Sequence, residues 1–206
     1  MYEITELMEG ARNCVVGYTG VRKGENVIIY TDRSGKVDPL VVEAMVIAVE
    51  EVGAKAIILN ERAPIYRLGG HLARPVVEAL AHADATIQLF ELENAASIDC
   101  FDIQRILFEY DIRMTLVITN TAELLASDWA RFPGEVSAAL RRKTSEQVKD
   151  APFHLWDANG TDLHGHLKGM SGESFIEKGG PPMGFNLTFF PGTTVAFHPE
   201  SPVNGT

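Results

Sequence analysis

Hydrophobic residues follow two patterns in the first 150 residues of the chain. Residues 2–18 place them three and four positions apart, which predicts an amphipathic helix. Further helices are expected at residues 38–53, 74–83, 101–110 and 134–149. Short apolar runs that are too brief for helices predict buried strands at residues 26–31, 55–59, 85–90 and 114–119. Apolar strands that alternate with helices indicate a parallel sheet covered on both faces, so we expect an α/β, Rossmann-like domain over residues 1–150.

The pattern changes after residue 150. Glycine and proline become frequent, helical spacing disappears, and the segments "FHLWD", "TDLHGHL" and "TTVAFH" alternate as strands do. A small β-rich domain is therefore expected over residues 151–206.

Composition and charge exclude several classes of protein. The 206 residues contain no apolar run of the roughly 18 residues that a membrane-spanning helix needs, and the chain begins without the pattern of a signal peptide, so a cytoplasmic protein with no membrane partner is expected. The formal net charge of −10 argues against nucleic acid as a partner. No strand-to-helix turn carries a glycine-rich phosphate-binding motif, so neither NAD nor ATP is expected. Cys14 and Cys100 are expected to be reduced and buried.

The stretch "NGTDLHGHLKG", residues 159–169, is the first candidate for chemistry. If it is extended, Asp162, His164 and His166 point to one face of a strand. Two imidazoles and a carboxylate can share a zinc or iron ion. A solvated polar strand face has the same spacing, so the sequence leaves a metal site and an exposed polar face as alternatives.

The segment "KGGPPMGFNLTFFPG", residues 178–192, is the second candidate. It combines backbone-permissive glycines with aromatic residues beside expected strand edges, and an extended peptide can bind to such a surface through main-chain hydrogen bonds. The candidate peptide-binding residues are Met183, Phe185, Asn186, Phe189, Phe190 and His198. Ordinary packing between the two domains is the alternative explanation for the aromatic residues.

Several segments together resemble a known family. "GYTGVRKGENVIIYTD", followed by a helix and "VGAKAIIL", is similar to the opening of the thermophilic-type leucyl aminopeptidases, which are metallopeptidases, and of the related 2,5-dihydroxypyridine 5,6-dioxygenases. "NGTDLHGHL" resembles their G-T-D-L strand, and "FFPGTTVAFHPESPVNGT" resembles their N-x-P-x-G-E-V segment with its later N-G-T turn. The similarity spans most of this chain and the N-terminal part of a family member.

The resemblance also implies a defect at the metal site. In the family the glutamate of the P-x-G-E-V segment is a metal ligand, and Thr194 stands at its position here. A threonine hydroxyl is neutral and offers no anionic oxygen to a divalent cation. The other family ligands are expected beyond Thr206, and the histidines of "DLHGHL" match none of them. The resemblance therefore implies a pseudoenzyme without a cofactor.

Family-like proteins without a working metal site are known as peptide-binding components of pathways that modify ribosomally made peptides, such as the crocagin pathway. We therefore expect a non-catalytic, homodimeric protein that presents a precursor peptide to modifying enzymes. The alternative is a metal-dependent aminopeptidase or ring-cleaving dioxygenase that uses Asp162, His164 and His166, or ligands from a further domain. A third hypothesis is a purely structural subunit whose β-rich end pairs with another copy.

Overall fold

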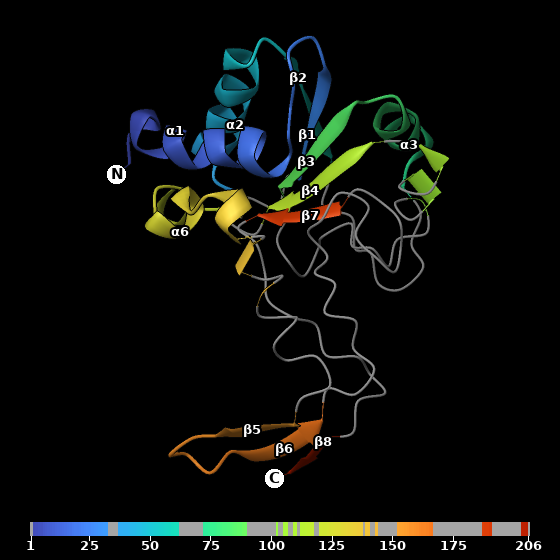
Figure 1. Ribbon diagram of the computed structural model, residues 1–206. Helices are drawn as coiled ribbons and strands as arrows, with labels where there is room; N and C mark the ends of the chain where they lie inside the picture. The colour runs from blue at the N-terminus through green and yellow to red at the C-terminus, as the bar shows by residue number, and fades with distance from the viewer. Residues whose placement is uncertain are drawn as a thin grey trace.

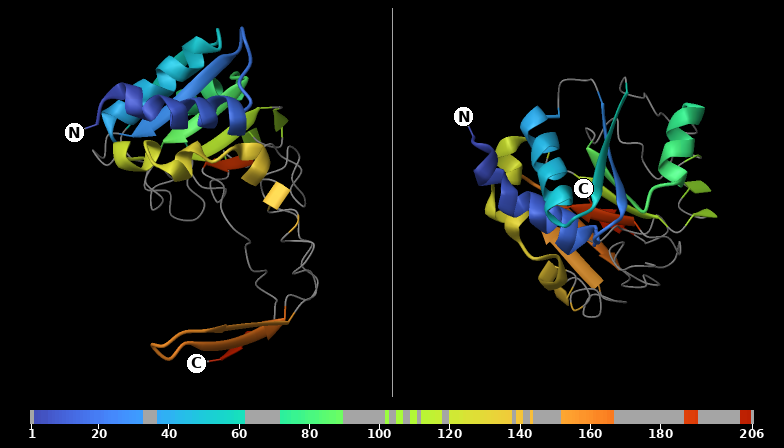
Figure 2. Two further views of the ribbon diagram at one scale, coloured as in Figure 1. Left: turned by 60° about the vertical axis from the view of Figure 1, so that its left-hand side comes forward. Right: turned by 90° about the horizontal axis from the view of Figure 1, so that it is seen from above.

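The chain forms two β-sheets, one parallel with helices around it and one small and antiparallel (Figure 1). The computed structural model describes residues 2–32, 37–61, 72–89, 112–117, 120–137, 152–166, 187–190 and 203–205, together with residues 102, 105, 106, 109, 110, 139, 140 and 143. In Figure 1 and in the left view of Figure 2 the small sheet is drawn apart from the large one.

The helices and strands follow the expected order. The helical elements are α1 (Ile4–Arg12), η1 (Asn13–Tyr18), α2 (Pro39–Glu51), α3 (Arg74–Ala81), α5 (Ala122–Leu125) and α6 (Asp128–Arg131). The strands are β1 (Asn26–Asp32), β2 (Lys55–Glu61), β3 (Ala85–Leu89), β4 (Arg113–Val117), β5 (Pro152–Trp156), β6 (Asp162–His166), β7 (Leu187–Phe190) and β8 (Val203–Gly205). The described residues of the helices expected at 101–110 and 134–149 are helical at 102, 105, 106 and 109, and at 134–137, 139, 140 and 143.

Five parallel strands make the large sheet in the order β2-β1-β3-β4-β7. β1 lies between β2 and β3, with Ile29 paired to Ile58 on one side and to Ile87 on the other. Parallel neighbours need crossover connections, and α2 and α3 lie in the two crossovers of this first half. The predicted α/β class with a mostly parallel, helix-covered sheet and a small β-rich unit is confirmed.

The strand β7 crosses the boundary expected between the domain of residues 1–150 and the domain of residues 151–206. Leu187–Phe190 belongs to the segment after residue 150, yet it pairs with β4 as the fifth strand of the parallel sheet. The cause is the side chain of Phe190, which is fully buried in the core beside η1. An apolar strand within a glycine-rich segment thus completes the first sheet instead of the second.

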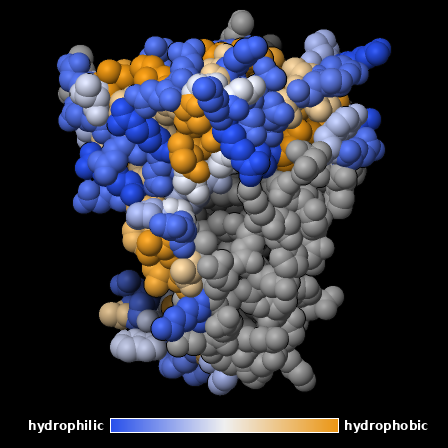
Figure 3. Space-filling view, turned by 45° about the horizontal axis from the view of Figure 1, so that its top comes forward, coloured by the Kyte–Doolittle hydropathy of each residue, from blue (hydrophilic) through white to orange (hydrophobic). Residues whose placement is uncertain are grey.

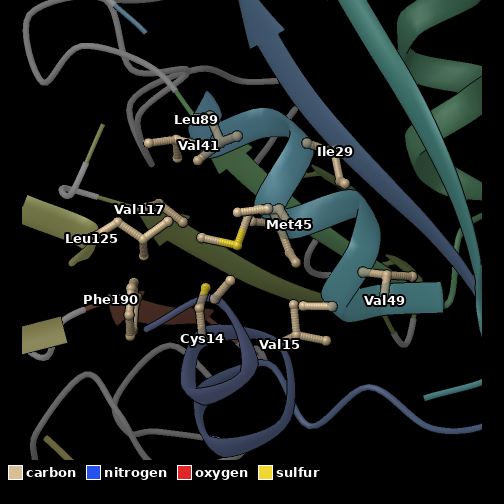
Figure 4. Packing of buried hydrophobic residues seen from close by; sticks show 14 of the residues in the cluster. Cys14, Val15, Ile29, Val41, Met45, Val49, Leu89, Val117, Leu125 and Phe190 are labelled. Atoms are coloured by element: carbon tan, nitrogen blue, oxygen red, sulfur yellow. The ribbon is translucent and has the colours of Figure 1, made fainter. Parts of the chain in front are cut away.

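Each face of the parallel sheet has its own hydrophobic core. One core joins α1, η1 and α2 to Val27, Ile29 and Ile87, whereas the other joins α3 to Ile28 and Tyr30. Figure 2 shows α2 and α3 on opposite sides of the strands. In the first core Met45 of α2 and Cys14 of η1 face one another (Figure 4), and both side chains are completely buried. Because neighbouring side chains of a strand point to opposite faces, β1 supplies both cores at once.

Local sequence signals explain the ends of the helices. The Asp38 carboxylate accepts a hydrogen bond of 2.9 Å from the Leu40 amide, Pro39 begins α2, and Gly53 has the positive φ of 81° that suits the turn after the helix. The helix expected at residues 2–18 begins as α1 and continues with the wider π-helical turns of η1. The helices α5 and α6 were not predicted, because four residues are too few to show a helical period.

Two further expectations concern thiols and membranes. Cys14 is a free, buried cysteine, and burial raises the pKa of its thiol far above the usual range, so it stays protonated in the core. Cys100 lies outside the described residues. Among the described residues, none of the helices has the length and apolar character needed to cross a membrane.

Gly10 of α1 lies directly against the segment around α5 and α6. A Cβ atom added there would lie 2.2 Å from the main-chain oxygen of Leu125 and 3.1 Å from Cβ of Ala130. We expect Gly10→Ala to lower the free energy of unfolding by about 1–3 kcal/mol, although alanine favours an exposed helix by about 1 kcal/mol over glycine. Chemical denaturation of both proteins measures the difference.

The matched control is a comparison of the variants Glu9→Ala and Glu9→Gly at the exposed neighbouring position, where the alanine variant should have the higher free energy of unfolding. If alanine stabilised the protein equally at positions 9 and 10, the close contact with Leu125 would be refuted.

Candidate metal centre

The small sheet brings histidines from two strands to one face. β5 and β6 are antiparallel neighbours in which His154 pairs with His164 and Trp156 pairs with Asp162. Alternate residues of a strand share a face, and directly paired residues do too, so His154, Asp162 and His164 lie together. β8 pairs with the other side of β6.

A tight turn fixes the register of this hairpin. The Asp157 carboxylate accepts hydrogen bonds from the amides of Asn159, at 2.7 Å, and Thr161, at 3.2 Å, and from the Thr161 hydroxyl at 3.0 Å. Gly160 has a φ of 104°, which side chains other than glycine rarely adopt. The turn chemistry of "DANGT" therefore determines which residue of β5 lies opposite His164.

The three side chains converge on a single oxygen. Nε2 of His154 lies 2.7 Å from Oδ1 of Asp162, and Nε2 of His164 lies 3.1 Å from the same atom. The two imidazole rings are stacked, with centroids 3.9 Å apart and an angle of 15° between their planes. All three side chains are about half exposed, so ions and ligands in solution reach them.

The histidines change the acidity of the carboxyl group. The hydrogen bond from His154 is the largest cause of the lowered pKa of Asp162; burial acts in the opposite direction, and the charges of His164 and His154 and the hydrogen bond of His164 lower the pKa further. The carboxylate is therefore anionic over the whole neutral range. One anionic oxygen and two imidazole nitrogens, with one ligand atom from each residue and all of these within 4.8 Å of one another, form a donor set for a divalent metal.

This geometry changes the metal set inferred from the sequence. Asp162 and His164 belong to the cluster, and the second imidazole is that of His154, whereas the side chain of His166 lies outside the described part of the structure. The spacing within one strand was readable from the sequence. The cross-strand neighbour was not, because it depends on the register that the Asp157 turn sets.

The candidate peptide-binding residues are only partly described. Phe190 is fully buried and packs edge-on against Tyr18, with ring centroids 4.9 Å apart, so its side chain belongs to the core and not to a peptide-contacting surface. The backbone of Phe189 lies in β7, but its side chain is outside the description. Met183, Phe185, Asn186 and His198 lie outside the described residues, as does Thr194.

An open hollow of about 700 Å³ lies beside α1, η1 and α2, and Arg12 of α1 and Glu51 of α2, which line it, form a double hydrogen bond of 2.7 and 2.8 Å. These two charges satisfy one another. On the face shown in Figure 3, hydrophobic side chains form separate groups among hydrophilic ones. The cluster on the small sheet is thus the better candidate for chemistry among the described residues.

The turn residue Asp157 gives a pH dependence that can be measured. Hydrogen bonds from the Thr161 and Asn159 amides and the Thr161 hydroxyl lower its pKa. A lowered folded-state pKa means that the carboxylate stabilises the hairpin fully above the unfolded value of about 3.9, and that this contribution is lost as the pH falls through the lower folded value. An NMR titration of the Asp157 carboxyl carbon should therefore show a midpoint below that of an unstructured aspartate.

Thr161→Val keeps the backbone donors and removes the hydroxyl, so it should raise the Asp157 pKa only part of the way. A wild-type midpoint at the ordinary aspartate value would contradict the turn geometry.

Comparisons with known proteins support the fold. No protein-family model matches the sequence, and no curated protein matches it either. The solved structure of 2,5-dihydroxypyridine dioxygenase from Pseudomonas putida KT2440 is similar, with a TM-score of 0.50 and 17% sequence identity, over 81% of this chain and 48% of that chain. The chain therefore spans about half the length of this dioxygenase. At this identity the likeness establishes a shared α/β fold and no more.

Proposed function

We propose that this chain is a non-catalytic peptide-binding protein on a scaffold related to the metallopeptidases and dioxygenases, and that it presents a precursor peptide to modifying enzymes. The observation that carries the proposal is the position of β7. It comes from the glycine-rich and aromatic segment, and it is the last strand of the parallel sheet among the described residues. An edge strand offers unpaired main-chain groups to which an extended peptide can add as a further strand.

The core holds this edge in place. Phe190 is buried against Tyr18, and β7 also contacts η1, so β7 has a fixed position before any peptide arrives. A preformed edge lowers the entropy cost of binding, because the peptide alone must be ordered. The net charge of −10 favours a peptide that carries lysine or arginine.

Thr194 supports binding without cleavage. The residue at the family's glutamate position has a neutral hydroxyl, so the donors present do not fit the metal that the family holds there. A metal-dependent hydrolase or ring-cleaving dioxygenase is the second candidate. The likeness to a dioxygenase and the cluster of His154, Asp162 and His164 favour it.

Two measurements, calorimetric titration and amide hydrogen exchange, test the first proposal. Both use the full chain and two extended peptides of matched length, one with several lysines and one with glutamates in their place. We expect the basic peptide to bind at least about tenfold more tightly and to slow exchange at the amides of residues 187–190. Mass spectrometry should recover it uncut.

Each other result has a defined meaning. Cleavage of the peptide would favour the enzyme. Protection of β2 in place of β7 would contradict the proposed edge, and the absence of binding to any extended peptide of the host's biosynthetic pathways would overturn the function.

We propose that β2, the strand at the other end of the sheet among the described residues, forms a homodimer with a second copy of the chain. The amide of Lys55 donates to the Glu25 carbonyl, so the odd-numbered residues of β2 direct their main-chain groups toward β1. The main-chain groups of Ala56, Ile58 and Asn60 then face away from the sheet. Ile57 and Ile58 are both about half exposed, which is unusual for two adjacent isoleucines.

The sequence of β2 complements itself when it pairs antiparallel across a twofold axis at Ile58. In that register Ile58 meets its own copy, Ala56 meets Asn60, and the position of Lys55 lies opposite that of Glu61. The same outward-facing groups pair on both copies, and opposite charges meet at both ends. Cross-strand pairs of this kind contribute roughly 0.2–1 kcal/mol each.

Sedimentation at micromolar concentrations tests the dimer. Ile58→Glu should give a monomer, because two like charges would meet on the axis, whereas Val16→Glu adds a charge at an equally exposed position on η1 and should leave the dimer intact. Lys55→Glu should weaken association, and adding Glu61→Lys should restore it. A monomeric wild-type protein would refute this interface, and so would an Ile58→Glu variant that remains a dimer.

A further inference from the structure

We infer that His154, Asp162 and His164 form a binding site for a divalent transition-metal cation of the zinc class, distinct from the metal position of the related enzymes. The inference uses a different surface from the proposed peptide edge and stands without it. Its observations are the convergence of three donor atoms, the constraint of the hairpin and the exposure of the cluster.

The donor atoms already lie close to the spacing that a metal requires. Ligands bound tetrahedrally at about 2.0–2.1 Å lie about 3.3 Å from one another. The two Nε2 atoms lie 2.7 and 3.1 Å from Oδ1 of Asp162, so these two nitrogen–oxygen distances need to lengthen by less than about 1 Å to make room for the ion. The side chains are about half exposed, so they have room to rotate.

Metal binding also requires proton changes at the two rings. In the metal-free protein each Nε2 that donates to Asp162 carries a proton. When a metal binds, each neutral ring holds its proton on Nδ1 and offers the Nε2 lone pair, and any imidazolium releases one proton to solvent. Asp162 exchanges two hydrogen bonds for one bond to the cation and remains anionic.

The chemistry of the donors selects the class of ion. Two imidazole nitrogens favour zinc, cobalt, nickel, copper or ferrous iron over calcium and magnesium, which prefer all-oxygen sites. Three protein ligands leave at least one coordination position for water or a donor atom of a partner. The surrounding turn is held by Asp157, so the two strands present the ligands on a fixed frame.

The hairpin also explains why His154 is the partner of His164. The stacked rings, at 3.9 Å, follow from their direct pairing across β5 and β6. Loss of either ring leaves two donors, which is too few for a stable zinc site. Asp162 reaches both rings because it lies on the same face, two residues before His164.

Calorimetric titration of zinc into the full chain, purified without a histidine tag and freed of metal with a chelator, tests the site. We expect one equivalent to bind reversibly. His154→Phe keeps an aromatic ring in the stack and removes the ligand, and Asp162→Asn keeps the shape and removes the charge. Each should weaken zinc binding by at least about tenfold. Calcium should not compete.

Two further variants sharpen the result. His82→Phe removes a histidine at the end of α3, far from the hairpin in sequence, and should leave zinc binding unchanged. His166→Ala tests the ligand that strand spacing alone indicates. Loss of binding in His166→Ala with retention in His154→Phe would overturn the assignment, as would the absence of saturable binding at millimolar zinc.

The Thr161 amide signal shows whether each variant keeps the hairpin. If His154→Phe loses this signal, Asp162→Asn decides the question. Wild-type affinity in Asp162→Asn would overturn the site, and a loss of affinity with the turn intact supports it. Peptide binding can fail while zinc binds, so the two proposals are tested separately.

Discussion

The rest of the fold depends on the two-sided pairing of β1. This strand hydrogen-bonds to β2 and β3 at once, and its alternating side chains enter two cores, with Ile29 on one face and Tyr30 on the other. A parallel strand in this position has no face left for water, so helices must cover both sides. That requirement brings α1, η1 and α2 to one face and α3 to the other.

The sequence predicts those parts of the structure in which a local pattern and a global need coincide. Asp38, Pro39 and Gly53 mark α2 correctly because caps act within one or two turns. The β-branched run of β1 marks that strand because it is buried on both faces, whereas β2 was expected to be buried and is about half exposed at Ile57 and Ile58. The fold class follows from their alternation. Such signals are short-range, so they do not require knowledge of the partner in space.

The features that were missed depend on distant partners. "LTFF" reads as part of a glycine-rich segment, and only its contact with η1 and β4 makes it a strand of the first sheet. His154 was visible as a histidine, but its pairing with His164 depends on the register of a hairpin. Two of the three donors of the candidate site were therefore predictable, since spacing along one strand gave Asp162 and His164, and the third donor came from the neighbouring strand.

The late position of β7 has a consequence for how the protein folds. β4 ends at Val117 and its neighbour begins at Leu187, so the chain must close a long loop, with the antiparallel hairpin inside it, before the last strand of the sheet can form. Pairs of such high sequence separation form late, because loop closure costs entropy that the contact repays only afterwards. During synthesis the four N-terminal strands can assemble while Tyr18 still lacks its aromatic neighbour. The sheet edge that we associate with peptide binding is thus the last part of the sheet to become available.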